Sequence, residues 1–148
     1  MQSRLDPFAV APDLMQDMRD LELRVRQAGL EPGLVELVKL RASQINGCAF
    51  CIDMHATDAR RHGETHARLD LLPAWREAPV YTERERAALA WTEALTLVAQ
   101  THAPDDDYER LGRHFDERER VALTLLVCAI NAWNRIAIGF RRPPALQE

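Results

Sequence analysis

Four residues between positions 36 and 55 have the types and spacing needed to do chemistry together. Two residues separate Cys48 from Cys51, His55 follows as the fourth residue after Cys51, and Glu36 lies twelve positions before Cys48. If the stretch from Cys48 onward is helical, both sulfurs and the imidazole lie on one helix face within one to two turns. Cysteines at this spacing near a helix start can form a small-ring disulfide, and the helix N-terminus favours the thiolate.

Such a pair suits a two-step redox cycle. One thiolate attacks an oxidant and becomes a sulfenic acid, and the other sulfur condenses with it to give a disulfide and water. A nearby imidazole, with an ordinary pKa of about 6.5, can take the thiol proton and return one to the leaving oxygen. The spacing suits His55 to that role, and Glu36 could orient its ring and set its tautomer.

Other interpretations of the cysteine pair compete with this one. Cys48, Cys51, His55 and Glu36 are acceptable zinc ligands, although structural zinc sites usually gather their ligands in two separated pairs. The cysteines could instead be small buried hydrophobic residues, with the histidine at the surface. Covalent haem is excluded because Ile52, and not a histidine, follows the second cysteine. A thioredoxin-like fold would need a βαβ pattern around the pair, which the sequence does not have.

The hydrophobic periodicity predicts an all-α bundle of about six or seven helices. Proline, glycine and capping signals divide it at about residues 12–29, 31–45, 47–63, 65–72, 82–98, 105–114 and 117–140. Thr82 with Glu85, and Asp116 with Glu119, have the spacing of helix-capping pairs. We expect a single domain over residues 1–148, with a loosely tied arm at 1–10 and a mobile tail at 141–148.

Two helix faces lead to specific expectations. Leu14, Met18, Leu21 and Val25 recur at steps of four and three and predict the packed face of the first helix. In the second helix, one polar stripe lies opposite a broad apolar face and comprises Glu36, Lys39 and Ser43. That stripe allows an alternative in which Glu36 is solvated and pairs with Lys39 at i,i+3, instead of facing the cysteines.

Composition limits the functions that fit. The chain has 148 residues, 47% of them hydrophobic and 28% charged, with a net charge of -4, which is typical of one globular domain. No basic stripe indicates nucleic-acid binding, and the nearly apolar run at 121–130 is too short to span a membrane. We find no secretory signal at the N-terminus, so we expect a cytoplasmic, reducing location, where a close cysteine pair favours redox chemistry or metal binding.

The last helix holds further residues of interest. Cys128 lies among apolar residues, and we expect a buried structural thiol. Trp91 and Trp133 are expected in the core or at subunit contacts. Polar residues on this apolar helix must find partners if they are buried. They predict a hydrogen-bonded interface or the edge of the site, and we favour the interface: Asn131, Asn134 and Arg135.

The spacing E-x11-C-x2-C-x3-H, met by Glu36, Cys48, Cys51 and His55, resembles the signature of alkylhydroperoxidase D-like proteins of the carboxymuconolactone decarboxylase superfamily. NGCAFCIDMH is a characteristic local string, and ALAWTEALT at 88–96 and NAWNRIAIGFR at 131–141 also resemble this family. The likeness covers most of the chain. The decarboxylase branch of the superfamily lacks the cysteine pair, so we do not expect that activity.

The resemblance implies an all-α fold, a homo-oligomer of three or six subunits and a peroxidase cycle without a cofactor or metal. It implies that Cys51 attacks the hydroperoxide and that Cys48 is the more accessible resolving cysteine, which meets the reducing partner, a dithiol reductant or a reductase protein. His55 and Glu36 would form the proton relay. The best-known members carry a second histidine between the cysteines, where this chain has Phe50. The alternative from another class is a non-enzymatic redox sensor or oligomeric scaffold.

Overall fold

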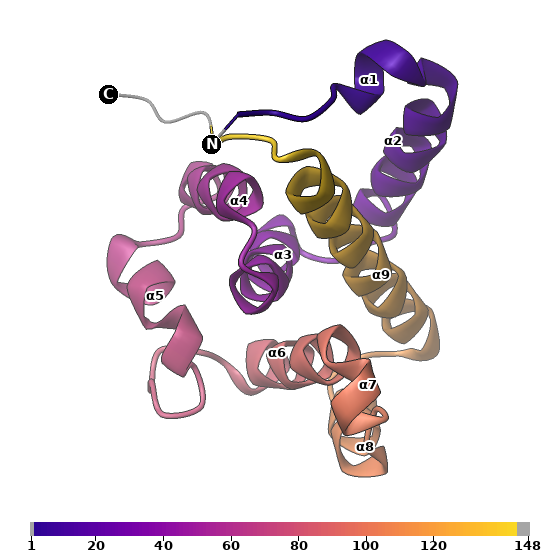
Figure 1. Ribbon diagram of the computed structural model, residues 1–148. Coiled ribbons are helices and arrows are strands. Elements are labelled where there is room, and N and C mark those ends of the chain that lie inside the picture. The colour runs from indigo at the N-terminus through magenta and orange to yellow at the C-terminus, as the bar shows by residue number, and fades with distance from the viewer. Residues whose placement is uncertain (1, 145–148) are drawn as a thin grey trace.

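The computed structural model describes residues 2–144, and within that range the chain is all-α, without a strand (Figure 1). The elements are α1 (Pro7–Val10), α2 (Pro12–Arg26), α3 (Pro32–Asn46), α4 (Ala49–Arg61), α5 (His66–Leu71), the 3-10 turn η1 (Leu72–Ala74), α6 (Glu83–Thr96), α7 (Val98–Thr101), α8 (Asp105–Gly112) and α9 (Glu117–Phe140). The all-α prediction is confirmed, and every predicted helical segment is present. The short α1 and α7, each of four residues, are additions to the predicted set.

Helix α3 lies at the centre of the fold and packs against α4, α6 and α9 (Figure 1). Val35 and Val38 enter an apolar cluster with α6 and α9. Leu37 and Leu40 enter a second cluster with η1 and α6. Neighbouring helices cover α3 on several sides, so its polar stripe of Glu36, Lys39 and Ser43 is buried as well. The solvated face that the helical periodicity allowed for this stripe is not found.

The helix ends follow local sequence rules. Thr82 and Asp116 begin α6 and α9 with capping boxes, as predicted. Gly47 ends α3 in the left-handed region, with φ of 69°, which glycine adopts without steric penalty. The chain turns there directly into α4, so that Cys48 becomes the N-cap of that helix.

The N-terminal segment, for which we expected a loosely tied arm at 1–10, is attached to the end of α9 through residues 3–4. The backbone N–H of Arg4 donates to the carbonyl of Phe140 at 3.0 Å, and its guanidinium donates to the carbonyl of Gly139 at 3.0 Å. These carbonyls belong to a helix C-terminus, where no partner exists within the helix. Asp6 then caps α1. Part of the predicted tail, residues 145–148, lies outside the described residues, as does residue 1.

Two expectations about burial are wrong. Leu14, predicted on the packed face of α2, is 64% exposed, whereas Met15 and Val25 are the buried residues of that helix. Cys128 is exposed, because α9 packs through the opposite side and leaves an outward stripe with Val121 and Leu125. A short apolar run in the sequence does not tell which of its members point outward.

Helix α9 as a whole, at 24 residues, is long and apolar enough to cross a membrane by length and composition, although the run at 121–130 alone is not. Its contacts are those of a core helix, because it packs against α2, α3 and α6. Length and composition alone are weak grounds for a membrane span when the helix packs against several others in the core of the fold.

A polar contact joins α3 to α9. Asn46 donates to the side-chain oxygens of Asn131 at 3.0 Å and Asn134 at 2.9 Å, and Asn134 donates to the hydroxyl of Ser43 at 3.0 Å. Arg135 donates to Asn131 on its own helix. These bonds lie within one chain, so the predicted subunit interface is not what satisfies these side chains.

Replacement of Asn134 by alanine tests this contact. The substitution removes one of the two acceptors of Asn46 and a partner of the buried Ser43, and we expect it to lower the free energy of unfolding by about 2–3 kcal/mol. Urea unfolding monitored by circular dichroism measures the change. The exposed Arg118→Ala on the same helix is the control, with an expected change within about 0.5 kcal/mol. Equal effects of the two substitutions would contradict a structural role for the contact.

Candidate functional site

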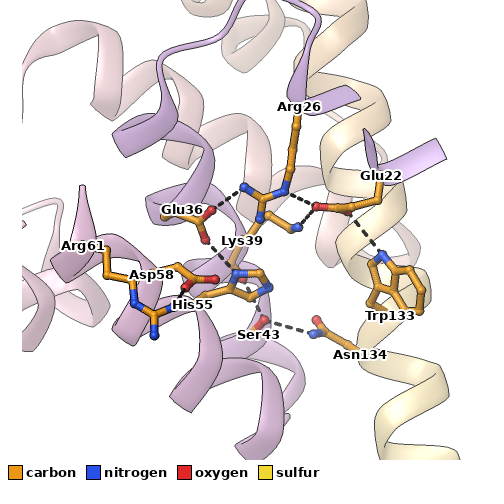
Figure 2. Close-up of polar contacts among 10 residues, drawn as sticks. All are labelled: Glu22, Arg26, Glu36, Lys39, Ser43, His55, Asp58, Arg61, Trp133 and Asn134. Carbon is orange, nitrogen blue, oxygen red and sulfur yellow. Dashed lines mark hydrogen bonds and ion pairs between the residues drawn. The ribbon is translucent and has the colours of Figure 1, made fainter. Parts of the chain in front are cut away.

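The residues singled out in the sequence meet where α3 packs on α4. The Nδ1 atom of His55 lies 2.8 Å from a carboxylate oxygen of Glu36, and both side chains are buried (Figure 2). The turn at Gly47 makes this meeting possible, because it folds α4 back along α3. The alternative of a solvated Glu36 paired with Lys39 is wrong, since the Glu36 residue is 0% exposed and Lys39 pairs elsewhere.

Cys48 and Cys51 are joined as a disulfide in this structure. The sulfur of Cys48 caps α4 and accepts a hydrogen bond from the backbone N–H of Cys51 at 3.3 Å. Both residues pack against Ala137 of α9 and Phe50. They are 1% and 2% exposed respectively, so the expected greater accessibility of Cys48 is not found.

Glu36 belongs to a chain of charges, two buried and two half-buried, that the sequence reasoning missed. The guanidinium of Arg26 donates to Glu36 at 2.6 Å and to Glu22 at 2.6 Å, so it bridges two carboxylates (Figure 2). The ammonium of Lys39 also binds Glu22. The indole N–H of Trp133 donates to the other oxygen of Glu22 at 3.2 Å. Two carboxylates thus face two cations in the interior, and each charge is compensated.

The electrostatics keep Glu36 ionised. Burial by itself opposes the charge, but the hydrogen bonds and charges of its partners outweigh it and lower the pKa of Glu36 from 4.5 to about 2. Arg26 provides a charge that does not titrate in the accessible pH range. Burial, again the largest effect, lowers the pKa of His55, and the nearby Lys39 adds to that lowering against the opposing hydrogen bond of Glu36.

A neutral His55 beside an ionised carboxylate has one favoured tautomer. The proton sits on Nδ1 and is donated to Glu36, and Nε2 is left as a lone-pair acceptor. Within the described residues, Nε2 is buried and has no hydrogen-bond partner. A buried imidazole nitrogen held in this way is available to accept a proton from a group in the site.

A cavity of about 710 Å³ borders the site. Cys51 and His55 both line it, whereas Cys48 does not. Its walls come from α1, α2, α3, α4, α9, the N-terminal segment and Arg142 after α9. The attachment of residues 3–4 to the end of α9 places the N-terminal segment in this wall. The cavity therefore reaches one sulfur of the pair together with the imidazole.

The geometry does not favour the zinc interpretation. The described residues whose ligand atoms lie within 4.8 Å of one another are Glu36, His55 and Asp58, a set without either cysteine. Asp58 already pairs with Arg61 at 2.8 Å, and Arg26 is bonded to Glu36. A divalent cation placed there would meet a guanidinium in direct contact with one of its ligands.

The missed residues left only a weak signal in the sequence. Glu22 and Arg26 stand at i,i+4, which is the ordinary spacing of a solvated helix pair. Lys39, the chain's one lysine, lies one turn after Glu36. Two polar stripes of complementary charge on consecutive helices are compatible with burial against each other. Residue spacing alone, however, does not determine which helix faces pack together.

The chain matches the family described as the Carboxymuconolactone decarboxylase family over residues 12–94, which is more than half of its length. It is 44% identical over 139 residues to the uncharacterized protein YdfG of Bacillus subtilis (strain 168), covering 94% of this chain and 95% of that protein. These findings show that the chain belongs to the carboxymuconolactone decarboxylase family.

Solved structures indicate which members of this family the chain is similar to. A crystal structure from Agrobacterium tumefaciens, described as a protein of unknown function and a candidate antioxidant defence protein AhpD, is 45% identical, with a TM-score of 0.96 over 99% of this chain and 100% of that one. A peroxidase-related protein from Ralstonia eutropha JMP134, described as an alkylhydroperoxidase AhpD core, is 20% identical, with a TM-score of 0.82 over 93% of this chain and 73% of that one, and shows the fold alone. The protein is an AhpD-like member of its family.

Replacement of Arg26 by glutamine tests the charge chain. It leaves Glu36 buried without its permanent cation, so the pKa of Glu36 in the folded protein should rise. We expect a loss of about 2–3 kcal/mol in the free energy of unfolding at pH 7, below the range for a fully buried pair because the Arg26 side chain is 33% exposed. The exposed Arg24→Gln on the same helix is the matched control.

The pH dependence gives the sharper readout. A carboxyl whose pKa is lowered on folding stabilises the native state above its ordinary pKa, and that contribution is lost as the pH falls from 4.5 toward about 2. The difference between wild type and Arg26→Gln should therefore shrink across that window in urea unfolding. A difference that stays constant from pH 7 down to the acid limit would contradict an ionised Glu36.

Proposed function

We propose that the protein is a thiol-dependent peroxidase that reduces hydroperoxides through Cys51 and Cys48. The observation that carries the proposal is that Cys51 and His55 line one cavity while Glu36 holds the imidazole in place. Family membership and the AhpD-like relative from Agrobacterium support redox chemistry of an antioxidant kind.

The first step takes place on the reduced protein. His55 Nε2 accepts the proton of the Cys51 thiol, and the resulting thiolate attacks the terminal hydroperoxide oxygen. The S–O bond forms as the O–O bond breaks, and the alkoxide leaves as an alcohol after taking the proton from the imidazolium. Cys51 is then a sulfenic acid, and the peroxide has received two electrons from sulfur. Glu36 stabilises the imidazolium while it carries the proton.

The second step closes the disulfide. Cys48 sulfur attacks the Cys51 sulfur, the S–S bond forms as the S–O bond breaks, and hydroxide leaves as water with the Cys48 proton. The N-cap position of Cys48 favours its thiolate, because its sulfur accepts a backbone N–H. An external dithiol then reduces the pair and is itself oxidised to a disulfide. Phe50 stands where the best-known relatives carry a histidine, so in this chain His55 alone carries the Cys51 proton to the alkoxide.

Other parts of the proposal come from sequence composition and from the family resemblance. We propose a cytoplasmic location, where dithiol reductants keep thiols reduced, and a homo-oligomer of three or six subunits. The proposed function involves no nucleic-acid or membrane partner. Size-exclusion chromatography with light scattering of the reduced protein measures the assembly directly.

A single-turnover reaction tests the cysteine cycle. Fully reduced protein with a small excess of cumene hydroperoxide should lose two thiols rapidly and yield a peptide linked through Cys48 and Cys51. The Cys48→Ser protein should accumulate sulfenic acid on Cys51, trapped by dimedone and located by mass spectrometry. Cys128→Ser is the control and should react as the wild type does.

Two outcomes would contradict the proposal. Sulfenic acid on Cys48 in the Cys51→Ser protein, formed at the wild-type rate, would reverse the assigned roles. Thiols that persist for hours would exclude a peroxidase, and an oxidation-dependent change in oligomer size together with slow turnover would favour a redox sensor.

The His55→Gln substitution tests the proton transfer. It should slow Cys51 oxidation at pH 7 by roughly 10²-fold or more, the usual contribution of a general base. Because burial lowers the pKa of His55 below its ordinary value of 6.5, the wild-type rate should be lost only at pH values below 6.5, as the imidazole takes up a proton. Stopped-flow thiol oxidation across pH 5–8 measures both effects. A variant with an unchanged rate would exclude His55 as the base.

A further inference from the structure

The cavity beside Cys51 is much larger than a small peroxide needs. At about 710 Å³ it falls within the range of roughly 300–1,000 Å³ that accommodates drug-sized ligands. Aromatic and aliphatic side chains dominate its walls: Phe8, Phe50, Met54, Trp133, Ile136 and Phe140. Walls of this kind fit a substrate with an apolar body, and ring faces favour a planar or aromatic one.

The inner charges of the cavity are already compensated. Glu22 is bound by Arg26 and Lys39, and Asp58 is paired with Arg61. Asp6 also lines the cavity, but it is exposed and accepts the backbone N–H of Phe8 as the cap of α1. The ion-paired groups leave little net charge to recognise a ligand in the interior.

Two arginines on the cavity wall differ from these inner groups. The guanidinium of Arg19 lies 4.6 Å from the centre of the Phe8 ring, and that of Arg142 lies 5.3 Å from the same centre and 4.1 Å from the centre of Phe50. Neither arginine forms an ion pair with a carboxylate among residues 2–144. Cation–π contact holds both of them over the rings that line the cavity.

Two like charges over one ring repel each other, and an anion bound beside them relieves that repulsion. We propose that the substrate is amphiphilic, with an apolar, ring-containing body in the cavity and a carboxylate bound by Arg19 and Arg142. The reacting peroxide would then lie at the Cys51 end of the body. The use of this cavity for a hydroperoxide rests on the proposed function, whereas recognition of the carboxylate can be measured without any turnover.

A binding comparison on the disulfide form of the full chain tests the inference. The probes are 4-isopropylbenzoate and 4-isopropylbenzamide, which share a body and differ in charge. Calorimetry should give an affinity for the acid about three- to tenfold higher than for the amide at low ionic strength, as partly exposed charge pairs allow. Added salt should reduce this preference. The acid should also shift the indole N–H signal of Trp133, which lines the cavity.

The Arg19→Gln, Arg142→Gln double variant should bind the acid and the amide equally. Arg118→Gln removes an exposed arginine that does not line the cavity, and it should keep the preference for the acid. Equal affinities in the wild-type protein, no binding of the acid, or a preference that survives in the double variant would overturn the inference.

The two proposals fail separately. A protein that prefers the acid through these arginines but does not reduce hydroperoxides would end the peroxidase proposal and still have the recognition site. A protein that reduces cumene hydroperoxide rapidly but does not distinguish acid from amide would retain the peroxidase proposal and lose the recognition site.

Discussion

An ionised carboxylate in the interior must have countercharges and hydrogen-bond donors around it. The burial of Glu36 imposes this requirement on the residues of the whole site. An isolated buried charge is penalised by several kcal/mol, and in proteins it survives only with paired charges and hydrogen bonds. Arg26 provides the permanent countercharge, and its second bond to Glu22 ties that charge into a balanced set with Lys39. His55 occupies the remaining carboxylate oxygen. Removal of any one of these charges leaves another uncompensated.

The fold can be understood as the scaffold that this charge set needs. Glu22 and Arg26 come from α2, Glu36 and Lys39 from α3, and His55 from α4 (Figure 2). Helix α9 supports the same set through Trp133, which binds Glu22, and holds α3 in register through its asparagine contacts. The chemistry at the cysteines therefore depends largely on contacts that are distant in the sequence. The turn at Gly47 and the i,i+4 pair of Glu22 with Arg26 are local contributions.

Local signals in the sequence predicted the helices well. Capping residues and the breaker at Asn46-Gly47 act within a few positions, so the limits of α3, α6 and α9 could be placed closely. The burial of Glu36 could not be derived from local signals. Helical periodicity assumes one solvated face, whereas α3 has neighbouring helices on several sides. The outward position of Cys128 and the hydrogen bonds of the N-terminal segment to α9 could not be derived for the same reason. They depend on which helices pack together, and periodicity does not encode that.

The state of His55 is the most direct test of a carboxylate that orients the base. ¹⁵N NMR of histidine-labelled protein distinguishes the two neutral tautomers and the imidazolium by their nitrogen shifts. We expect a neutral ring with its proton on Nδ1 at pH 7, and loss of that fixed tautomer in the Glu36→Gln protein, where an amide replaces the charged acceptor. An imidazolium at pH 7, or a proton on Nε2 in the wild-type protein, would contradict a His55 prepared by Glu36 to accept the Cys51 proton.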